Sequence, residues 1–143
     1  VRVGRARQRL VAADLGAQAH ATDDLFDVPC DVFAPCALGG MVSMKTLPRI
    51  QAPIIAGAAN NQLASDGTAD EIQRRGILYA PDFAINAGGL IHVTLDLKIY
   101  SQPEVEKKTR EIYHTILSIY ERSRDTGRPT AAIAVELAKE KIA

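Results

Sequence analysis

The chain has 143 residues, a length typical of one domain, and 47% of them are hydrophobic and 24% charged. Its 17 basic and 17 acidic residues balance, which argues against a surface that attracts nucleic acid or anionic membranes. No apolar run approaches the ~18 residues that span a bilayer. Cys30 and Cys36 are too few for a disulfide scaffold and lack partners for a metal site. We therefore expect a cytoplasmic protein without a membrane, nucleic-acid or metal partner.

The first residues are basic, with four arginines among the first nine. A strand end is predicted at residues 1–3 and a helix at 5–15, stopped by Gly16. A solvated helix face is the main interpretation of the arginines, and a phosphate contact is the alternative. A targeting peptide is rejected because the segment lacks serine and contains Asp14. The chain begins with valine rather than methionine, so we expect a fragment of a longer protein.

Short strands and short helices alternate in the following residues, which predicts a parallel sheet with helical crossovers. Proline and glycine mark the boundaries, and Pro48 is expected to interrupt one of the helices. The expected strands are residues 17–20, 31–34, 53–56 and 77–80, and the expected helical segments are 23–26, 43–50 and 68–75.

The last third of the chain has helical periodicity. Helices are predicted at 89–98, at 101–124 and at 130–142, and the second begins with a Ser101/Glu104 capping box. The expected apolar stripes consist of Val105, Ile112, Tyr113, Ile116, Leu117, Ile119 and Tyr120 on the long helix, and of Ile133, Leu137 and Ala138 on the last.

Three loops rich in small residues leave the ends of predicted strands: PCALGG (35–40), GAANN (57–61) and DFAINAGG (82–89). In the third, we expect an apolar strand to end at Asn86 and a glycine turn to open the next helix. Ligands of open parallel sheets bind beyond the carboxyl ends of the strands. Together the loops predict a shallow polar rim for a flat ligand with ribose hydroxyls and an amide.

A base for dehydrogenase chemistry is harder to find. Lys45, Asp82 and His92 are the candidates, but Asp82 is better explained as a turn cap and His92 as a helix-surface residue. Cys36 is better explained as a buried, unreactive cysteine than as a nucleophile. No phosphate-binding G-x-x-x-x-G-K-[ST] loop is present.

The segments CDVFAPCALGG (30–40), IIAGAANNQL (54–63) and GILYAPDFAINAGG (76–89) strongly resemble the Glu/Leu/Phe/Val dehydrogenase family, especially its leucine, valine and phenylalanine enzymes. The resemblance extends over nearly the whole chain. It implies an α/β fold with a partial Rossmann-like parallel sheet and flanking helices, followed by long C-terminal helices. It also implies oxidative deamination of an L-amino acid to a 2-oxo acid and ammonia with NAD or NADP, in an enzyme that is a homo-oligomer.

The same resemblance assigns site residues. Cys36, Ala37 and Leu38 correspond to the adenosine side of the cofactor, Asn60 and Asn61 to the nicotinamide ribose, and Asn86 to the contact with nicotinamide and substrate. Leu90 and Val93 correspond to the substrate side-chain pocket. Leu90 is larger than the glycine or alanine expected in a phenylalanine enzyme, which favours a branched aliphatic substrate. Phenylalanine remains the alternative.

The family's catalytic lysines and aspartate lie in an N-terminal domain that this sequence does not contain. We therefore expect residues 1–143 to be the C-terminal portion of a dinucleotide-binding domain, with strand and helix alternating over 1–90 and a helical segment over 91–143. No catalytic residue is expected in it. A match to the acidic residue that holds the NAD ribose is also missing, and Arg2 or Arg5 could instead contact the extra phosphate of NADP. A non-catalytic packing or oligomerisation module is the competing hypothesis.

Overall fold

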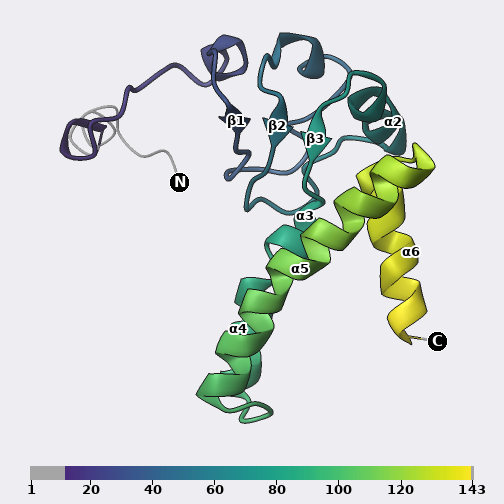
Figure 1. Ribbon diagram of the computed structural model, residues 1–143. Helices are drawn as coiled ribbons and strands as arrows, with labels where there is room; N and C mark the ends of the chain where they lie inside the picture. The colour runs from purple at the N-terminus through teal and green to yellow at the C-terminus, as the bar shows by residue number, and fades with distance from the viewer. Residues whose placement is uncertain (1–11, 143) are drawn as a thin grey trace.

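A computed structural model describes residues 12–142 and shows a parallel sheet flanked by helices (Figure 1). Its strand order is β1-β2-β3. The strands are β1 (Val32–Phe33), β2 (Ile54–Ile55) and β3 (Leu78–Tyr79), and neighbouring strands are parallel. The expected α/β class with a small parallel sheet and long C-terminal helices is confirmed.

Helical elements connect the strands and form the C-terminal part of the chain. They are the 3₁₀ turns η1 (Asp24–Asp27) and η2 (Leu47–Arg49), and the α-helices α2 (Asp66–Arg74), α3 (Asp82–Ile85), α4 (Gly88–Asp96), α5 (Gln102–Thr126) and α6 (Thr130–Ile142).

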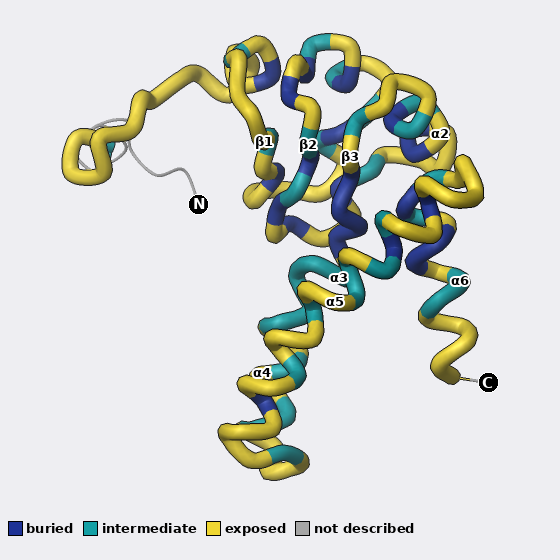
Figure 2. The backbone as a smooth tube through the Cα atoms, in the orientation of Figure 1, coloured by how far each residue is buried: buried dark blue, intermediate teal, exposed yellow. Residues whose placement is uncertain are grey.

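Two separate apolar clusters hold the fold together. The larger lies at the sheet and includes Leu47, Ile55 and Ile72. The smaller joins α5 to α6 through Ile119 and Ile133. Figure 2 shows buried residues gathered around the sheet and at the α5–α6 end, whereas the α4–α5 arm is mostly exposed.

Helices α2 and α5 begin or end at residues that suit helix termini. Ser101 and Glu104 form the expected capping box at the start of α5, with the Ser101 amide donating to Glu104 Oε2 over 2.7 Å. Gly76 and Gly127 follow α2 and α5 with φ of 68° each, a left-handed conformation that suits glycine.

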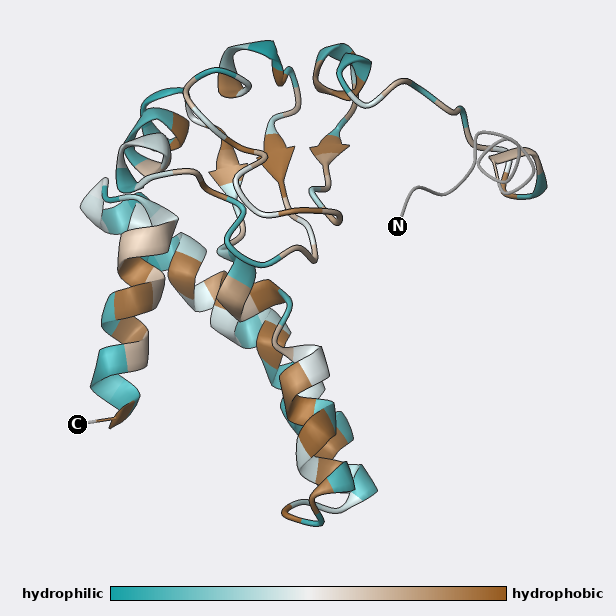
Figure 3. Cartoon of the chain, turned by 180° about the vertical axis from the view of Figure 1, so that it is seen from behind, coloured by the Kyte–Doolittle hydropathy of each residue, from teal (hydrophilic) through white to brown (hydrophobic). Residues whose placement is uncertain are grey.

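The arm formed by α4 and the first part of α5 extends away from the sheet, and hydrophobic residues alternate with hydrophilic ones along it (Figure 3). The stripe predicted on α5 is narrower than expected. Tyr113 is 67% exposed and Leu117 is also exposed, because α6 packs only on the side of α5 that carries Ile116 and Ile119. The inward position predicted for Ala138 is wrong as well, and Ala134 is buried instead.

Three predicted elements differ from the structure. Residues 17–20 are exposed and form no strand, because they do not pair with a strand in the described part of the chain. The helix predicted at 43–50 is a turn followed by η2. The Ser43 amide and the Ser43 hydroxyl both form hydrogen bonds with Thr46 Oγ1, and these compete with helical hydrogen bonds. Residues 82–85 form α3 rather than a strand, because the Asp82 carboxylate accepts the amide of Phe83 and starts a helical turn. The strand predicted at 1–3 and most of the helix at 5–15 lie outside the described residues.

Candidate functional site

The three small-residue segments meet at the carboxyl edge of the sheet. The Ala59 amide donates to the Pro35 carbonyl over 3.0 Å, and the Gly40 amide donates to the Asn61 carbonyl over 2.7 Å. The segment 82–89 joins them through Asn86, whose side chain lies 3.3 Å from the Ala58 carbonyl. The parallel topology therefore brings together three segments that are separate in the sequence, as expected.

Two glycines make this close approach possible. A Cβ atom on Gly57 would lie 2.3 Å from the Pro35 carbonyl oxygen, and one on Gly39 would lie 2.9 Å from that of Asn60. Gly88 and Gly89 differ: a Cβ on Gly88 would come no closer than 4.0 Å to another group, and one on Gly89 would meet nothing within 4 Å. Glycine at positions 39 and 57 therefore allows two loops to come into contact, whereas the surroundings of Gly88 and Gly89 leave room for a side chain.

A pair of asparagine side chains lies at the centre of the rim. Asn86 Nδ2 donates to Asn60 Oδ1 over 2.5 Å and to the Ala58 carbonyl over 3.3 Å. Both protons of that amide are therefore engaged. Within residues 12–142, Asn86 Oδ1 and Asn60 Nδ2 make no hydrogen bond, so the pair presents one acceptor oxygen and one donor NH₂ group.

Asn61, the third rim asparagine, contributes through its backbone. Its φ is 52°, a left-handed conformation that asparagine tolerates better than most residues. Its carbonyl is the acceptor for Gly40, so this bend joins the second loop to the first.

Beneath the rim lies a buried polar network that the sequence reasoning did not identify. Gln62 is 0% exposed and donates from Nε2 to the carbonyls of Gly57 (2.7 Å) and Ala59 (3.0 Å). Its backbone amide donates to Asp82 Oδ2 over 2.7 Å. The only sequence signal was a third amide residue directly after Asn60 and Asn61. The interpretation of Asp82 as a turn cap is confirmed, because its Oδ1 accepts the Phe83 amide over 2.7 Å.

The phenol of Tyr79 borders this network. Burial raises the pKa of Tyr79 far above its ordinary value, and the nearby Asp82 carboxylate raises it further. The Asp82 amide lies 3.4 Å from the phenol oxygen. Tyr79 is therefore a neutral phenol that packs under the rim rather than a proton acceptor.

The remaining residues assigned by resemblance lie on the surface. Cys36, Ala37 and Leu38 follow β1 and are exposed, Leu38 by 74%. The expectation of a buried Cys36 is wrong: the thiol is exposed at the loop surface, where its Sγ lies 3.4 Å from the Ala58 amide. A cavity of about 450 Å³ beside β1 includes Cys36 and Ala37 in its lining.

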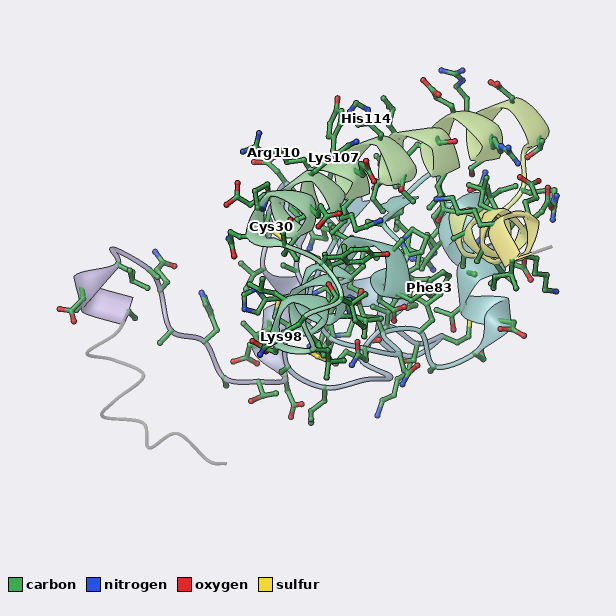
Figure 4. The ribbon with its side chains drawn as sticks, turned by 90° about the horizontal axis from the view of Figure 1, so that it is seen from below. Cys30, Phe83, Lys98, Lys107, Arg110 and His114 are labelled. Carbon is green, nitrogen blue, oxygen red and sulfur yellow. The ribbon has the colours of Figure 1, made fainter. Side chains whose placement is uncertain are left out.

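Leu90 and Val93 lie three residues apart on α4 and so share a face of that helix. Leu90 is 75% exposed and Val93 is exposed too. Phe83 of α3 is exposed as well, and in Figure 4 it lies apart from Lys107, Arg110 and His114 of α5. The structure thus places an apolar face next to the asparagine-bearing segment.

The candidate bases have no catalytic arrangement. Asp82 is engaged by two backbone amides, while Lys45 and His92 are exposed. Across residues 12–142 there is no cluster of three or more His, Cys, Asp or Glu side chains placed to hold a metal ion. In the same range no helix is long and apolar enough to cross a membrane.

Comparison with known proteins decides the family. The model of the Glutamate/Leucine/Phenylalanine/Valine dehydrogenase family matches residues 2–143. The chain belongs to this family. It is 44% identical over 130 residues to leucine dehydrogenase of Bacillus cereus, covering 91% of the chain and 36% of that enzyme. It is 43% identical over 123 residues to valine dehydrogenase of Streptomyces albus, covering 85% and 34%.

A solved structure shows the same architecture. The crystal structure of L-tryptophan dehydrogenase from Nostoc punctiforme superposes with a TM-score of 0.91 at 39% identity, over 98% of this chain and 43% of that one. The chain spans about a third of the length of the curated relatives it matches. These relatives act on different amino acids, so membership of the family does not define the substrate.

Proposed function

We propose that this chain is the C-terminal, cofactor-binding part of an NAD(P)-dependent amino-acid dehydrogenase, which oxidatively deaminates an L-amino acid to a 2-oxo acid and ammonia. The observation that carries the proposal is the Asn60–Asn86 pair at the carboxyl edge of a parallel sheet. This edge is where dinucleotides bind in related folds. The chain is proposed to comprise the sheet-containing part over residues 1–90 and a helical C-terminal segment over 91–143.

The rim residues fit a nicotinamide dinucleotide. The unused acceptor of Asn86 and the unused donor of Asn60 suit a carboxamide and a ribose hydroxyl, with Asn61 beside them. Cys36, Ala37 and Leu38 form an exposed surface without charged side chains, which suits the adenosine end. The nicotinamide ring would supply the hydride acceptor, and the residues of this chain would hold and orient it. NAD is the proposed cofactor, with NADP as the alternative.

The substrate side chain is proposed to contact Leu90 and Val93 on α4. These side chains are branched and apolar, they are exposed, and α4 begins directly after the segment that carries Asn86. A bulky leucine at position 90 limits the space for an aromatic ring, so a branched aliphatic amino acid is proposed and phenylalanine is the alternative. The discrimination expected from such a difference is only about 1–3 kcal/mol.

The groups that transfer protons are proposed to come from an N-terminal catalytic domain of the same enzyme. Asp82 is committed to two backbone amides, and it lies below the rim rather than on it. The chain alone is therefore proposed to be inactive, and the full-length enzyme is proposed to be a cytoplasmic homo-oligomer.

A non-catalytic packing module is the second candidate. The exposed apolar residues of the α4–α5 arm favour it, because such surfaces often mark contacts between proteins. The same surface could cover a catalytic domain, so it does not separate the two candidates. The activity of this chain when it is joined to a catalytic domain separates them.

A chimera tests the proposed function. The 130 residues of Bacillus cereus leucine dehydrogenase that align with this chain would be replaced by it, and NADH formation would be measured with leucine, valine and phenylalanine. We expect turnover with leucine and valine, little with phenylalanine, and none from the isolated 143-residue chain.

The matched control is the same chimera with Asn86→Ala, which we expect to lose most of its activity while remaining folded. A folded chimera without turnover on any of the amino acids would favour the packing module. Turnover by the isolated chain, above a heat-killed control, would refute the proposed division of the site.

A further inference from the structure

Gln62 is completely buried although its side chain is polar. Its Nε2 donates to the carbonyls of Gly57 and Ala59, which precede Asn60 in the same loop. Its Oε1 has no hydrogen-bond partner in the described part of the chain. A buried acceptor without a donor costs stability, so an apolar side chain would be the simpler filling. The distinctive contribution of Gln62 is therefore the way its Nε2 fixes the loop before Asn60.

Asp82 connects this loop to the segment that carries Asn86. Its Oδ2 accepts the Gln62 amide over 2.7 Å, and its Oδ1 accepts the Phe83 amide over 2.7 Å. The Asn86 amide donates to the Asp82 carbonyl over 2.9 Å, across the single turn of α3. Asp82 is itself buried, which strengthens hydrogen bonds to its carboxylate.

The two asparagines are thus attached to one buried network. Asn60 lies two residues before Gln62, and Asn86 lies one helical turn after Asp82. A shift of either segment would break the 2.5 Å contact between Asn86 Nδ2 and Asn60 Oδ1. That contact determines which atom of each amide points outward.

We propose that Gln62 and Asp82 are positioning residues that hold the Asn60–Asn86 pair in a single orientation, with one acceptor and one donor presented to the ligand. A freely rotating pair would present these groups only part of the time, and preorganisation removes that cost from binding. The importance of the network for cofactor binding rests on the proposed function, whereas the positioning itself is a property of the free chain.

The composition of the chain makes a sharp test possible. Its three asparagines, Asn60, Asn61 and Asn86, all lie at the rim. The full chain, labelled with ¹⁵N only in asparagine side-chain amides, would therefore give three NH₂ signals in an NMR spectrum. They would be assigned by replacing the asparagines one at a time. We expect the Asn86 protons to exchange with water about tenfold more slowly than those of Asn61, the ratio that corresponds to about one hydrogen bond.

Two variants weaken the network in different ways. Gln62→Met keeps the length of the side chain but removes the donors to Gly57 and Ala59. Asp82→Asn is milder: it retains an acceptor for Phe83 but turns a donor toward the Gln62 amide. Ile133→Val is the matched control: it weakens the α5–α6 cluster, which packs on α3 through Ala84 but includes no residue of the hydrogen-bonded network.

In both network variants we expect Asn86 exchange to accelerate about tenfold and its signals to shift. In Ile133→Val, the exchange of the Asn86 protons should stay as in the wild type when the two proteins are compared under conditions in which the same fraction of each is unfolded. NADH affinity should fall with the network variants only. If Gln62→Met does not fold, the exchange measured in Asp82→Asn tests the proposal.

Unchanged Asn86 and Asn60 signals in a folded network variant would overturn the proposal, as would an equal change in Ile133→Val. These readouts need no nucleotide. Asparagine signals that respond as expected in a chain that binds no NADH would contradict the proposed function and leave the positioning roles intact.

Discussion

The side-chain amide of Asn86 donates to Oδ1 of Asn60 over 2.5 Å, although the two residues belong to different segments of the chain. Removing either side chain removes this bond, so the effects of the two replacements should not add. We expect the free energies of unfolding of Asn60→Ala, Asn86→Ala and the double variant to give a coupling of about 1 kcal/mol.

Chemical denaturation of the four proteins measures that coupling. Asn86→Ala combined with Gln102→Ala is the control pair, because Gln102 is exposed on α5 and bonds only Glu106 in the described structure. Additive effects for Asn60 and Asn86, as for the control pair, would show that the contact contributes nothing in solution.

Gly57 should not tolerate a side chain. Because a Cβ at this position would lie 2.3 Å from the Pro35 carbonyl oxygen, Gly57→Ala must push the first two rim loops apart. We expect a loss of about 1–3 kcal/mol, or a Tm lower by about 3–10 °C. Gly89→Ala is the matched control, since its Cβ would meet nothing within 4 Å and the residue is helical. It should leave Tm unchanged or raise it slightly. Equal Tm values for the two variants would contradict the contact.

Glu71 should make stability depend on acid pH. Hydrogen bonds from Arg74 and then Arg75 lower the pKa of Glu71 to about 2. A depressed carboxyl pKa stabilises the folded state fully above the ordinary value of 4.5, and that contribution is lost as the pH falls toward 2. The Tm of Glu71→Gln should therefore lie below wild type near neutral pH, and the difference should shrink through this acid range.

Thermal melts at several pH values test this, with Glu121→Gln on the exposed side of α5 as the control. Because the Arg74 side chain is largely exposed, added salt should reduce the effect. A difference in Tm that persists unchanged below pH 4.5 would refute the assignment.

Local sequence patterns predicted the sheet because its strands are short apolar pairs set off by proline and glycine, as at Ile54–Ile55 between Pro53 and Gly57. The same patterns misassigned residues 82–85, since the short apolar run 83–85 fits a strand or a helix equally, and the hydrogen bond from the Phe83 amide to the Asp82 carboxylate favours the helix. Tyr113 and Leu117 looked like core because their spacing is helical, but no helix in the described structure covers that side of α5. The spacing of apolar residues identifies one face of a helix, but it does not show whether another element packs on that face.

The rim was predictable as three loops but not as a hydrogen-bonded network. The parallel order of β1, β2 and β3 implies that their exits are neighbours. The hydrogen bond from Asn86 Nδ2 to Asn60 Oδ1 depends on the burial of Gln62 and on the helical turn of α3. Neither feature leaves a pattern in the sequence. The burial of Gln62 is seen only in the structure.

Titration of the 143-residue chain with NADH, followed by nucleotide fluorescence, tests the central claim most directly. We predict measurable binding that Asn60→Ala and Asn86→Ala each weaken about tenfold, the equivalent of one hydrogen bond, while Gln102→Ala binds as wild type does. Equal affinity of all four proteins, or no binding even when the N-terminal domain of a leucine dehydrogenase is supplied, would contradict the assignment of this rim as the cofactor site.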